Sequence, residues 1–336
     1  MDRSNIVSSS NFFRSFIFIA ALCSGGMLVA PTFADEAVDW VEQMPRDSAY
    51  LYMAAEVDVG TDMQAATGQA EQLVKQEFER LFAFSYEPQD SQTSLERALR
   101  REVVSKLPAM TLPEVEFVSN EVNEEKSKLY VLGRVSRQTM LQMTEKRMAE
   151  IERHLSDYRH VGEDGERITQ LRVILPALPE VEEYKALRVV AAKLGASVKP
   201  KQTPIALLLD RKITILFNEF LVMLDDRIPE AVEYEADLAE ALRKKGLQIS
   251  AKQPDLVLKY IIERTGEYQE DQPLGLSAKI DMLDPRQVAY ASYEGAIELE
   301  NTLTPEIERK ALDLFADDVF KALTVRLLET TYQEKS

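Results

Sequence analysis

The feature that most constrains the fold is a long helical block in the middle of the chain. Across residues 137–195, apolar side chains recur at three- and four-residue spacing, the period of a helix with one buried face. The stripe consists of Leu141, Met148, Ile151, Leu155, Ile168, Leu171, Leu175, Val181, Tyr184, Leu187, Ala191 and Leu194. Pro176 and Pro179 interrupt the block, because proline cannot donate to the helix ladder. We therefore expect a helical connector over 137–198 between two other folded regions.

The region before the connector, residues 35–136, predicts a strand–helix–strand–strand module. Thr61 and Gln64 have the spacing of a capping box, which predicts a helix from there to about residue 84. The strands are expected at 49–57, 115–122 and 129–135, and a second, charged helix at 94–106. Tyr50 and Tyr52 are two positions apart, so we expect them on one strand face, in core or inter-strand packing.

The region after the connector, residues 199–336, predicts a second module with a long terminal helix. Residues 197–203 are the expected linker. Pro229 suits the first turn of a helix that ends at Gly246, and Thr304 with Pro305 suits the start of the terminal helix. The expected strands are 205–209, 213–223, 247–250, 256–264, 275–283 and 288–299. The expected core face of the terminal helix is Leu312, Phe315, Val319, Leu323 and Leu327.

These patterns together predict an α+β fold. We expect two small α/β modules, each an antiparallel sheet with helices on one face, joined by the helical connector. The expected divisions fall at 34, 136 and 198.

Residues 1–34 have the three parts of a signal peptide in order. Arg3 and Arg14 are basic, residues 15–30 are mostly apolar, and Thr32 and Ala34 fit a small-x-small cleavage site. The apolar stretch is shorter than the roughly 20 residues of a membrane span. We therefore expect export with cleavage after Ala34, and an uncleaved amino-terminal anchor is the alternative.

Cys23 is the only cysteine and lies inside this leader. It would carry a lipid anchor only if the chain were processed there, with outer-membrane association as the consequence. Cleavage after Ala34 instead gives a periplasmic chain without cysteine. Such a chain has no disulfide, no thiolate nucleophile and no cysteine metal ligand.

The charge of the chain disfavours two classes of partner. Lys and Arg number 40 against 57 Asp and Glu, a formal net charge of −17. A chain this acidic repels phosphate backbones, so we expect no nucleic acid partner. Anionic lipid surfaces are disfavoured for the same reason.

No motif in the sequence specifies a reaction, so we predict no catalytic, cofactor-binding or metal-binding residues. His154 and His160 are the only histidines and stand six positions apart, which is typical of surface residues rather than a zinc site. Phosphate-cradling glycine loops and a G-x-S-x-G turn are absent from the sequence. We expect Asp225-Asp226 to be solvated surface, although paired carboxylates are also what a glycosidase needs.

Two further features, a charged run and the tryptophan, are expected to be structural. The charged run 145–153 is expected to be a solvated helix face with i,i+4 pairs. Trp40, the only tryptophan, is expected to pack on the first module, with a partner-binding anchor as the alternative.

Both modules resemble envelope-protein families. The sequence Asp39-Trp40-Val41, then Pro45, the Tyr50-Leu51-Tyr52 strand, an alanine-rich helix and the Leu129–Leu132 strand resemble the LPP-twenty lipoprotein family. The helix that ends at Gly246, followed by Pro254–Leu258, a hairpin at Asp284 and a closing helix, is similar to the amino-terminal domain of TolB. The resemblances imply an envelope setting and no enzyme activity.

The expected function is therefore that of a non-enzymatic envelope protein. It would act as a binding or assembly factor for another envelope protein or an envelope polymer. A carboxylate-based envelope hydrolase is the alternative.

Overall fold

A computed structural model describes residues 44–123, 127–159, 165–196, 203–225, 233–265, 275–298 and 304–332. The leader with Cys23, residues 197–202 of the expected linker 197–203, and Trp40, His160, Asp226 and Pro229 lie outside the described residues.

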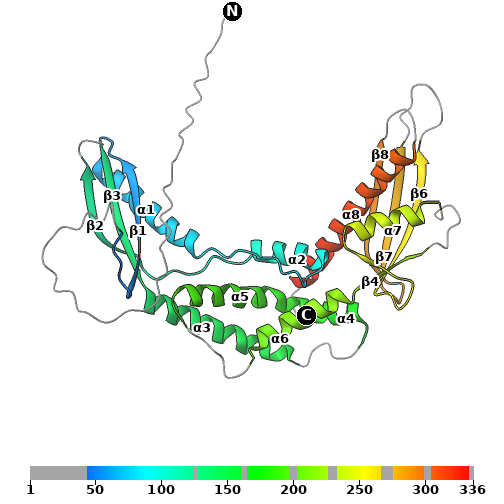
Figure 1. The fold of residues 1–336 in the computed structure, drawn as a ribbon, viewed down its shortest axis with the longest axis horizontal. Coiled ribbons are helices and arrows are strands. Elements are labelled where there is room, and N and C mark those ends of the chain that lie inside the picture. Colours follow the sequence, from blue (N-terminus) through cyan, green and yellow to red (C-terminus); the bar gives the residue numbers. More distant parts are fainter. Residues whose placement is uncertain are drawn as a thin grey trace, which may run out of the picture. The chain divides into compact units, whose positions relative to one another are not determined.

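The first sheet is the expected strand–helix–strand–strand module. It consists of β1 (Tyr50–Asp58), β2 (Glu116–Asn123) and β3 (Lys128–Ser136) in the order β1-β3-β2, with both pairs antiparallel. Helix α1 (Met63–Leu81) packs on β1 and β3 (Figure 1). At Gly133 of β3, a Cβ atom would lie 2.6 Å from Cγ1 of Val74 in α1, so glycine permits this close approach.

The capping box expected at Thr61 and Gln64 is wrong. The N-cap of α1 is Asp62, whose carboxylate accepts a hydrogen bond from the amide of Ala65 at 3.1 Å. Asp and Thr are both good N-cap residues, and the chain places the carboxylate rather than the hydroxyl at the non-helical position.

The middle of the chain is helical, as the sequence predicts. The helices are α2 (Ser94–Ser105), α3 (Arg137–Leu155), α4 (Arg167–Ile174) and α5 (Leu178–Lys193). The tighter turns η1 (Ser156–Tyr158) and η2 (Leu175–Ala177) lie between them. Pro176 and Pro179 stand at the first turns of η2 and α5, where a missing amide proton costs nothing.

The strand predicted at 205–209, and most of the one predicted at 213–223, are wrong. Residues 205–218 form one helix, α6 (Ile205–Asn218), and only β4 (Leu221–Asp225) is a strand. The buried side chains Ile205, Leu209 and Ile213 are four apart, which is the helical period. The carboxylate of Glu152 in α3 accepts hydrogen bonds from the first two amides of α6, at 2.8 and 3.0 Å.

The second sheet has five strands in the order β5-β4-β6-β7-β8. The new strands are β5 (Gln248–Ile249), β6 (Leu256–Thr265), β7 (Gly275–Leu283) and β8 (Ala289–Glu298). Helices α7 (Glu235–Lys244) and α8 (Pro305–Thr331) complete this region. Helix α8 packs on β7 and β8 as well as on α7, and its predicted core face is buried throughout.

The α+β class is confirmed, with one difference in the second sheet. Strand β4 runs parallel to β5 and β6, whereas β6, β7 and β8 are antiparallel, so the sheet is mixed rather than wholly antiparallel. The hairpin at Asp284 is as expected: its carboxylate accepts from the amides of Arg286 and Val288.

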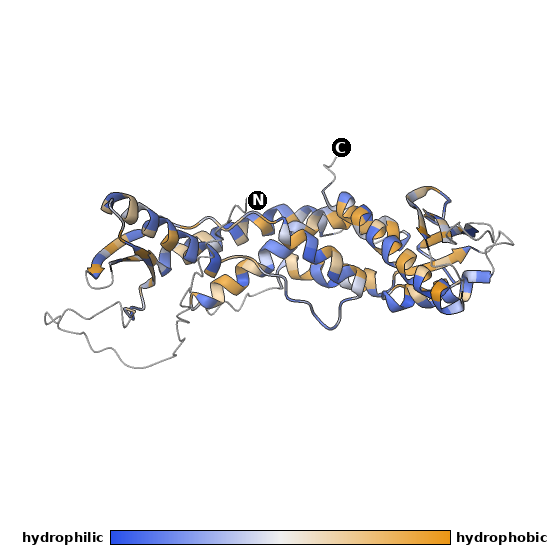
Figure 2. Cartoon of the chain, turned by 90° about the horizontal axis from the view of Figure 1, so that it is seen from above, coloured by the Kyte–Doolittle hydropathy of each residue, from blue (hydrophilic) through white to orange (hydrophobic). Residues whose placement is uncertain are grey.

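The described residues have two hydrophobic cores. The smaller core lies between α1 and the first sheet and includes Val74, Phe78 and Val131. The larger core joins α2 and the later helices to the second sheet, from Leu95 to Leu327. Hydrophobic and hydrophilic residues interleave along the helices, as packing of one buried stripe requires (Figure 2). Helix α2 therefore packs into the larger core, although it precedes two strands of the first sheet.

Candidate functional site

The face of the first sheet that points away from α1 is rich in tyrosine. Strand side chains alternate between faces, and Leu129, Val131 and Val135 of β3 point into the core with α1. The intervening residues of β3 and their cross-strand partners therefore share the opposite face. We call this set the tyrosine face: Tyr50, Tyr52 and Ala54 of β1, Tyr130, Leu132 and Arg134 of β3, and Ser119 and Glu121 of β2.

Arg134 of the central strand β3 contacts side chains of both neighbouring strands on this face. Its guanidinium carbon lies 4.0 Å from the centre of the Tyr50 ring, and its Nε donates to Oε2 of Glu116 in β2 at 2.9 Å. The rings of Tyr50 and Tyr52 are 6.3 Å apart and tilted. Hydrogen bonding to Glu116 and to Tyr52 raises the pKa of Arg134. The predicted packing of Tyr50 and Tyr52 on one strand face is confirmed.

The centre of the tyrosine face is apolar, and its three tyrosines are half-buried. Leu132 is 3 % exposed although it belongs to neither hydrophobic core. Tyrosine and arginine around a buried aliphatic side chain are the residue types enriched in the centres of protein interfaces.

The rim of the tyrosine face is acidic. Glu56, Asp58, Glu116 and Glu121 supply four carboxylates, and Lys128 joins Arg134 as a cation. The ammonium of Lys128 lies 3.1 Å from Glu56 and 2.6 Å from Asp58. Two cations against four carboxylates leave this rim negative, so it complements a basic surface.

Two of the residues singled out by sequence are not brought into any common site. His154 is exposed, as expected, with its Nδ1 3.1 Å from Glu180. Asp225 was expected to be solvated, and that is wrong: it is 5 % exposed at the end of β4. A strand residue beside β6 is covered by its neighbours, which the sequence pair alone does not reveal.

The charged run 145–153 is only partly the solvated face that was expected. Arg147 forms an ion pair with Glu150 within α3. Its guanidinium also donates two hydrogen bonds, of 2.7 and 2.8 Å, to the carboxylate of Glu183 in α5. Glu152 caps α6. These two residues therefore join helices while remaining partly exposed.

A buried ionic cluster, which sequence reasoning missed, joins α2, α5 and α6. Arg100 is fully buried and contacts Glu96, Glu182 and Asp210, the last at 2.7 Å. Lys185 contacts Glu182 and Asp210 from the side, at 3.1 and 3.2 Å. The cluster lies inside the helical core and has the properties of a structural network rather than an accessible site.

Burial raises the pKa of Glu96, against the attraction of Arg100 and a hydrogen bond from Thr214. Its Oε1 accepts from Arg100, whereas its Oε2 is buried without a hydrogen-bond partner among the described residues. A protonated Glu96 would leave Arg100 and Lys185 balanced by Glu182 and Asp210.

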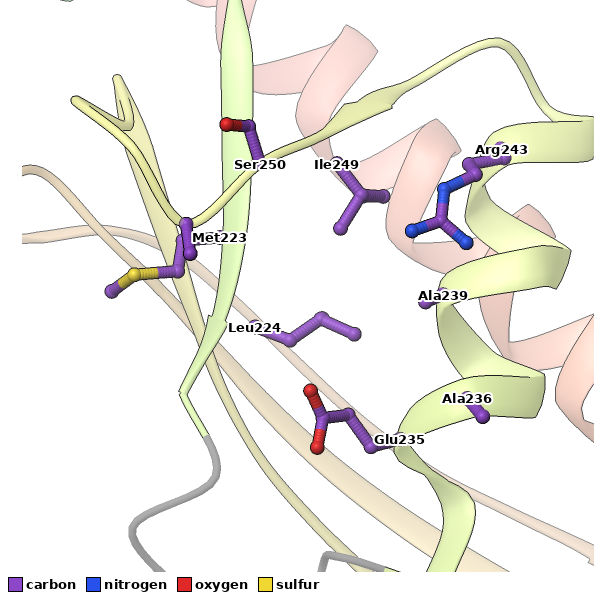
Figure 3. A pocket seen from close by; sticks show the side chains of 9 residues that line it. Met223, Leu224, Glu235, Ala236, Ala239, Arg243, Ile249 and Ser250 are labelled. Carbon is purple, nitrogen blue, oxygen red and sulfur yellow. The ribbon is translucent and has the colours of Figure 1, made fainter.

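A pocket of about 540 Å³ lies between β4, β5 and α7 (Figure 3). Leu224, Ile249 and Ala239 form its apolar part, and Glu235 and Arg243 stand on the helical wall. Glu235 is the only carboxylate among its lining residues. We call this the β4 groove.

The described residues contain neither a metal-ligand cluster nor a helix that could span a membrane. No three His, Cys, Asp or Glu side chains there are grouped as metal ligands. Likewise, none of the described helices combines the length and apolarity needed to span a bilayer.

Comparisons with known proteins give only distant likenesses. Neither the family models nor the curated proteins contain a match. The secreted protein HP1454 of Helicobacter pylori is similar at 15 % identity and a TM-score of 0.38, over 86 % of this chain and 100 % of that one. A minor lipoprotein of Acinetobacter baumannii is similar at 16 % identity and a TM-score of 0.23, over 32 % of this chain and 93 % of that one. With TM-scores below 0.5, these likenesses do not assign a function.

Proposed function

We propose that this chain is an exported, non-enzymatic protein of the bacterial envelope that docks another envelope protein through the tyrosine face. The single observation that carries the docking role is the aromatic–arginine stack on the sheet face opposite the one that α1 covers. Arginine and tyrosine lose little freedom on binding when they are already held in place, which favours affinity.

The charge of the face favours one kind of partner. Its acidic rim would attract a protein surface that is basic around an apolar centre. An envelope polymer made of neutral sugars would gain nothing from that rim. The partner we propose is therefore a protein with a basic rim.

A hydrolase is less well supported by the site geometry. Two carboxyl groups roughly 5–10 Å apart across a cleft are required for glycoside hydrolysis. The β4 groove has only Glu235 among its lining residues. Glu96 and Glu182 of the ionic cluster are buried in contact with Arg100, beyond the reach of a polymer.

The export part of the proposal rests on the leader. Intact-mass and amino-terminal sequencing of the protein from the producing cell should give a chain that begins at Asp35. A chain that keeps Met1, or one that begins at a lipid-modified Cys23, would contradict cleavage after Ala34.

The docking part is tested by co-purification after formaldehyde treatment of intact cells. The wild-type chain should recover one exported protein, and the double variant Tyr52→Ser/Tyr130→Ser should lose it. Leu314→Ser/Val325→Ser is the control, because both residues of α8 are about half exposed, at 51 % and 54 %. Equal recovery by all three chains would contradict the proposal.

The salt dependence of binding tests whether the recovered protein has a basic rim. With purified components, binding should weaken as salt rises, because the interaction between an acidic and a basic rim is screened. Salt-independent binding would contradict a basic-rimmed partner.

A further inference from the structure

The β4 groove has an incomplete β-ladder beside it. Strand β4 pairs with β6 as far as Asp225, but with β5 only at Leu221 and Val222. The sheet therefore loses its outer strand halfway along β4. Among the described residues, Met223 and Leu224 have no strand neighbour on the β5 side.

The hydrogen-bonding direction of β4 identifies the residue that faces this gap. The carbonyl of Leu221 accepts from Asp255, on the β6 side, and that of Val222 accepts from Ser250, on the β5 side, both at 2.8 Å. Backbone groups alternate between the two sides along a parallel strand. The amide and carbonyl of Leu224 therefore point to the β5 side, beyond the end of β5.

The groove offers side-chain space next to that backbone edge. Leu224 points toward α7 and forms the floor with Ile249 and Ala239 (Figure 3). A volume of about 540 Å³ lies within the range of roughly 300–1,000 Å³ typical of ligand sites. A backbone edge with no described strand beside it, next to a pocket with an apolar floor, is the arrangement used for recognition by strand addition.

The wall of the groove carries opposite charges at its two ends. Arg243 stands near Ile249 and Glu235 near the end of β4 (Figure 3). Neither forms a salt bridge with another described residue. Eight helical positions span about 12 Å. An extended chain covers that distance in about four residues.

We propose that the β4 groove binds an extended segment of another exported protein, which continues the line of β5 along β4. Side chains at alternate positions of a strand share one face. The segment therefore carries an acidic residue opposite Arg243, an apolar residue over Leu224 and a basic residue opposite Glu235, each two positions from the next. This surface is separate from the tyrosine face and does not depend on it.

The test uses the full mature chain and a short synthetic peptide with glutamate, valine and lysine at alternate positions and threonine between them. Fluorescence anisotropy should show binding, and hydrogen exchange should show slowed exchange at the Leu224 amide. A second peptide exchanges glutamate and lysine. We expect it to bind about three- to ten-fold more weakly, since two partly exposed ion pairs are lost.

Charge reversal on the protein gives the sharper test. The double variant Glu235→Lys/Arg243→Glu should prefer the exchanged peptide. Glu240→Lys/Lys244→Glu is the matched control, because it swaps an exposed pair on the same helix and should keep the wild-type preference.

Three results would overturn the proposal. They are binding of both peptides with equal affinity, binding without protection of the Leu224 amide, and displacement of the peptide by a short-chain phosphatidylcholine that binds more tightly. None of them bears on the tyrosine face.

Discussion

Arg134 lies over Tyr50 at 4.0 Å while the same guanidinium donates to Glu116 on the opposite strand. One side chain of the central strand thus holds both edges of the first sheet. The planar guanidinium does this by stacking flat on the ring while its Nε donates to the carboxylate, and a lysine ammonium has no planar face to stack. The tyrosine face is therefore ordered before a partner arrives.

Arg134→Lys should loosen this face although it keeps the charge. We expect a lower urea midpoint than that of the wild type, and weaker binding of the docked protein, because the planar stack and the Nε donor in its present geometry are lost. Arg309→Lys, at a side chain 67 % exposed, is the control and should leave both unchanged. Equal urea midpoints for the two variants would contradict the role given to Arg134.

The buried cluster predicts a much larger effect at Arg100. Arg100→Met leaves Glu182 and Asp210 with Lys185 as their only cation in the cluster, and removing one partner of a buried ion pair costs about 3–5 kcal/mol. Lys310→Met breaks a solvated pair and should change the free energy of unfolding by less than about 0.5 kcal/mol. Urea unfolding measures both, and a loss below about 1 kcal/mol at Arg100 would contradict the account.

The raised pKa of Glu96 predicts a pH-dependent stability. A carboxyl whose pKa is higher in the folded than in the unfolded chain stabilises the fold below about pH 4.3. That contribution is lost as the pH rises through the folded pKa. Glu96→Gln cannot ionise, so the free energy of unfolding of the wild type should fall relative to this variant between acid and neutral pH.

The measurement is urea unfolding of both proteins at several pH values. Both chains keep the rest of the cluster, which consists of Arg100, Glu182, Asp210 and Lys185. The difference in the free energy of unfolding between the two proteins therefore cancels the other titrating groups. A constant difference across the pH range would mean that Glu96 does not titrate differently in the folded chain.

The N-cap of α1 gives a prediction with a neighbouring control. Asp62→Ala should destabilise the chain by about 1 kcal/mol, because the amide of Ala65 loses its acceptor. Thr61→Ala should have little effect, since Thr61 is outside the cap. Thermal unfolding compares the two variants. A larger loss of stability for Thr61→Ala than for Asp62→Ala would mean that Thr61 is the N-cap residue.

The sequence predicts the elements better than the sites. Alternation at 129–135 and the pair Tyr50 and Tyr52 place side chains on strand faces, but only the sheet order brings β3 between the other two strands. The position of Arg134 over Tyr50 depends on that order. No periodicity in a single sequence carries it.

Long-range contacts explain what the pattern could not reveal. Arg100 stands on a charged helix, and its partners Glu182 and Asp210 are 82 and 110 positions away. Helix α6 begins on a cap supplied by Glu152, 53 positions earlier. Its β-branched residues favour a strand locally, and tertiary packing overrides that preference.

The most direct test of docking through the tyrosine face is site-specific photocrosslinking in intact cells. A photoreactive phenylalanine analogue is placed in turn at Tyr52, Tyr130, Leu314 and Val325, and the products are identified by mass spectrometry. We predict that the two tyrosine positions crosslink to the same exported protein and that the two α8 positions do not. Crosslinking of that protein only from α8, or from all four positions alike, would contradict the account.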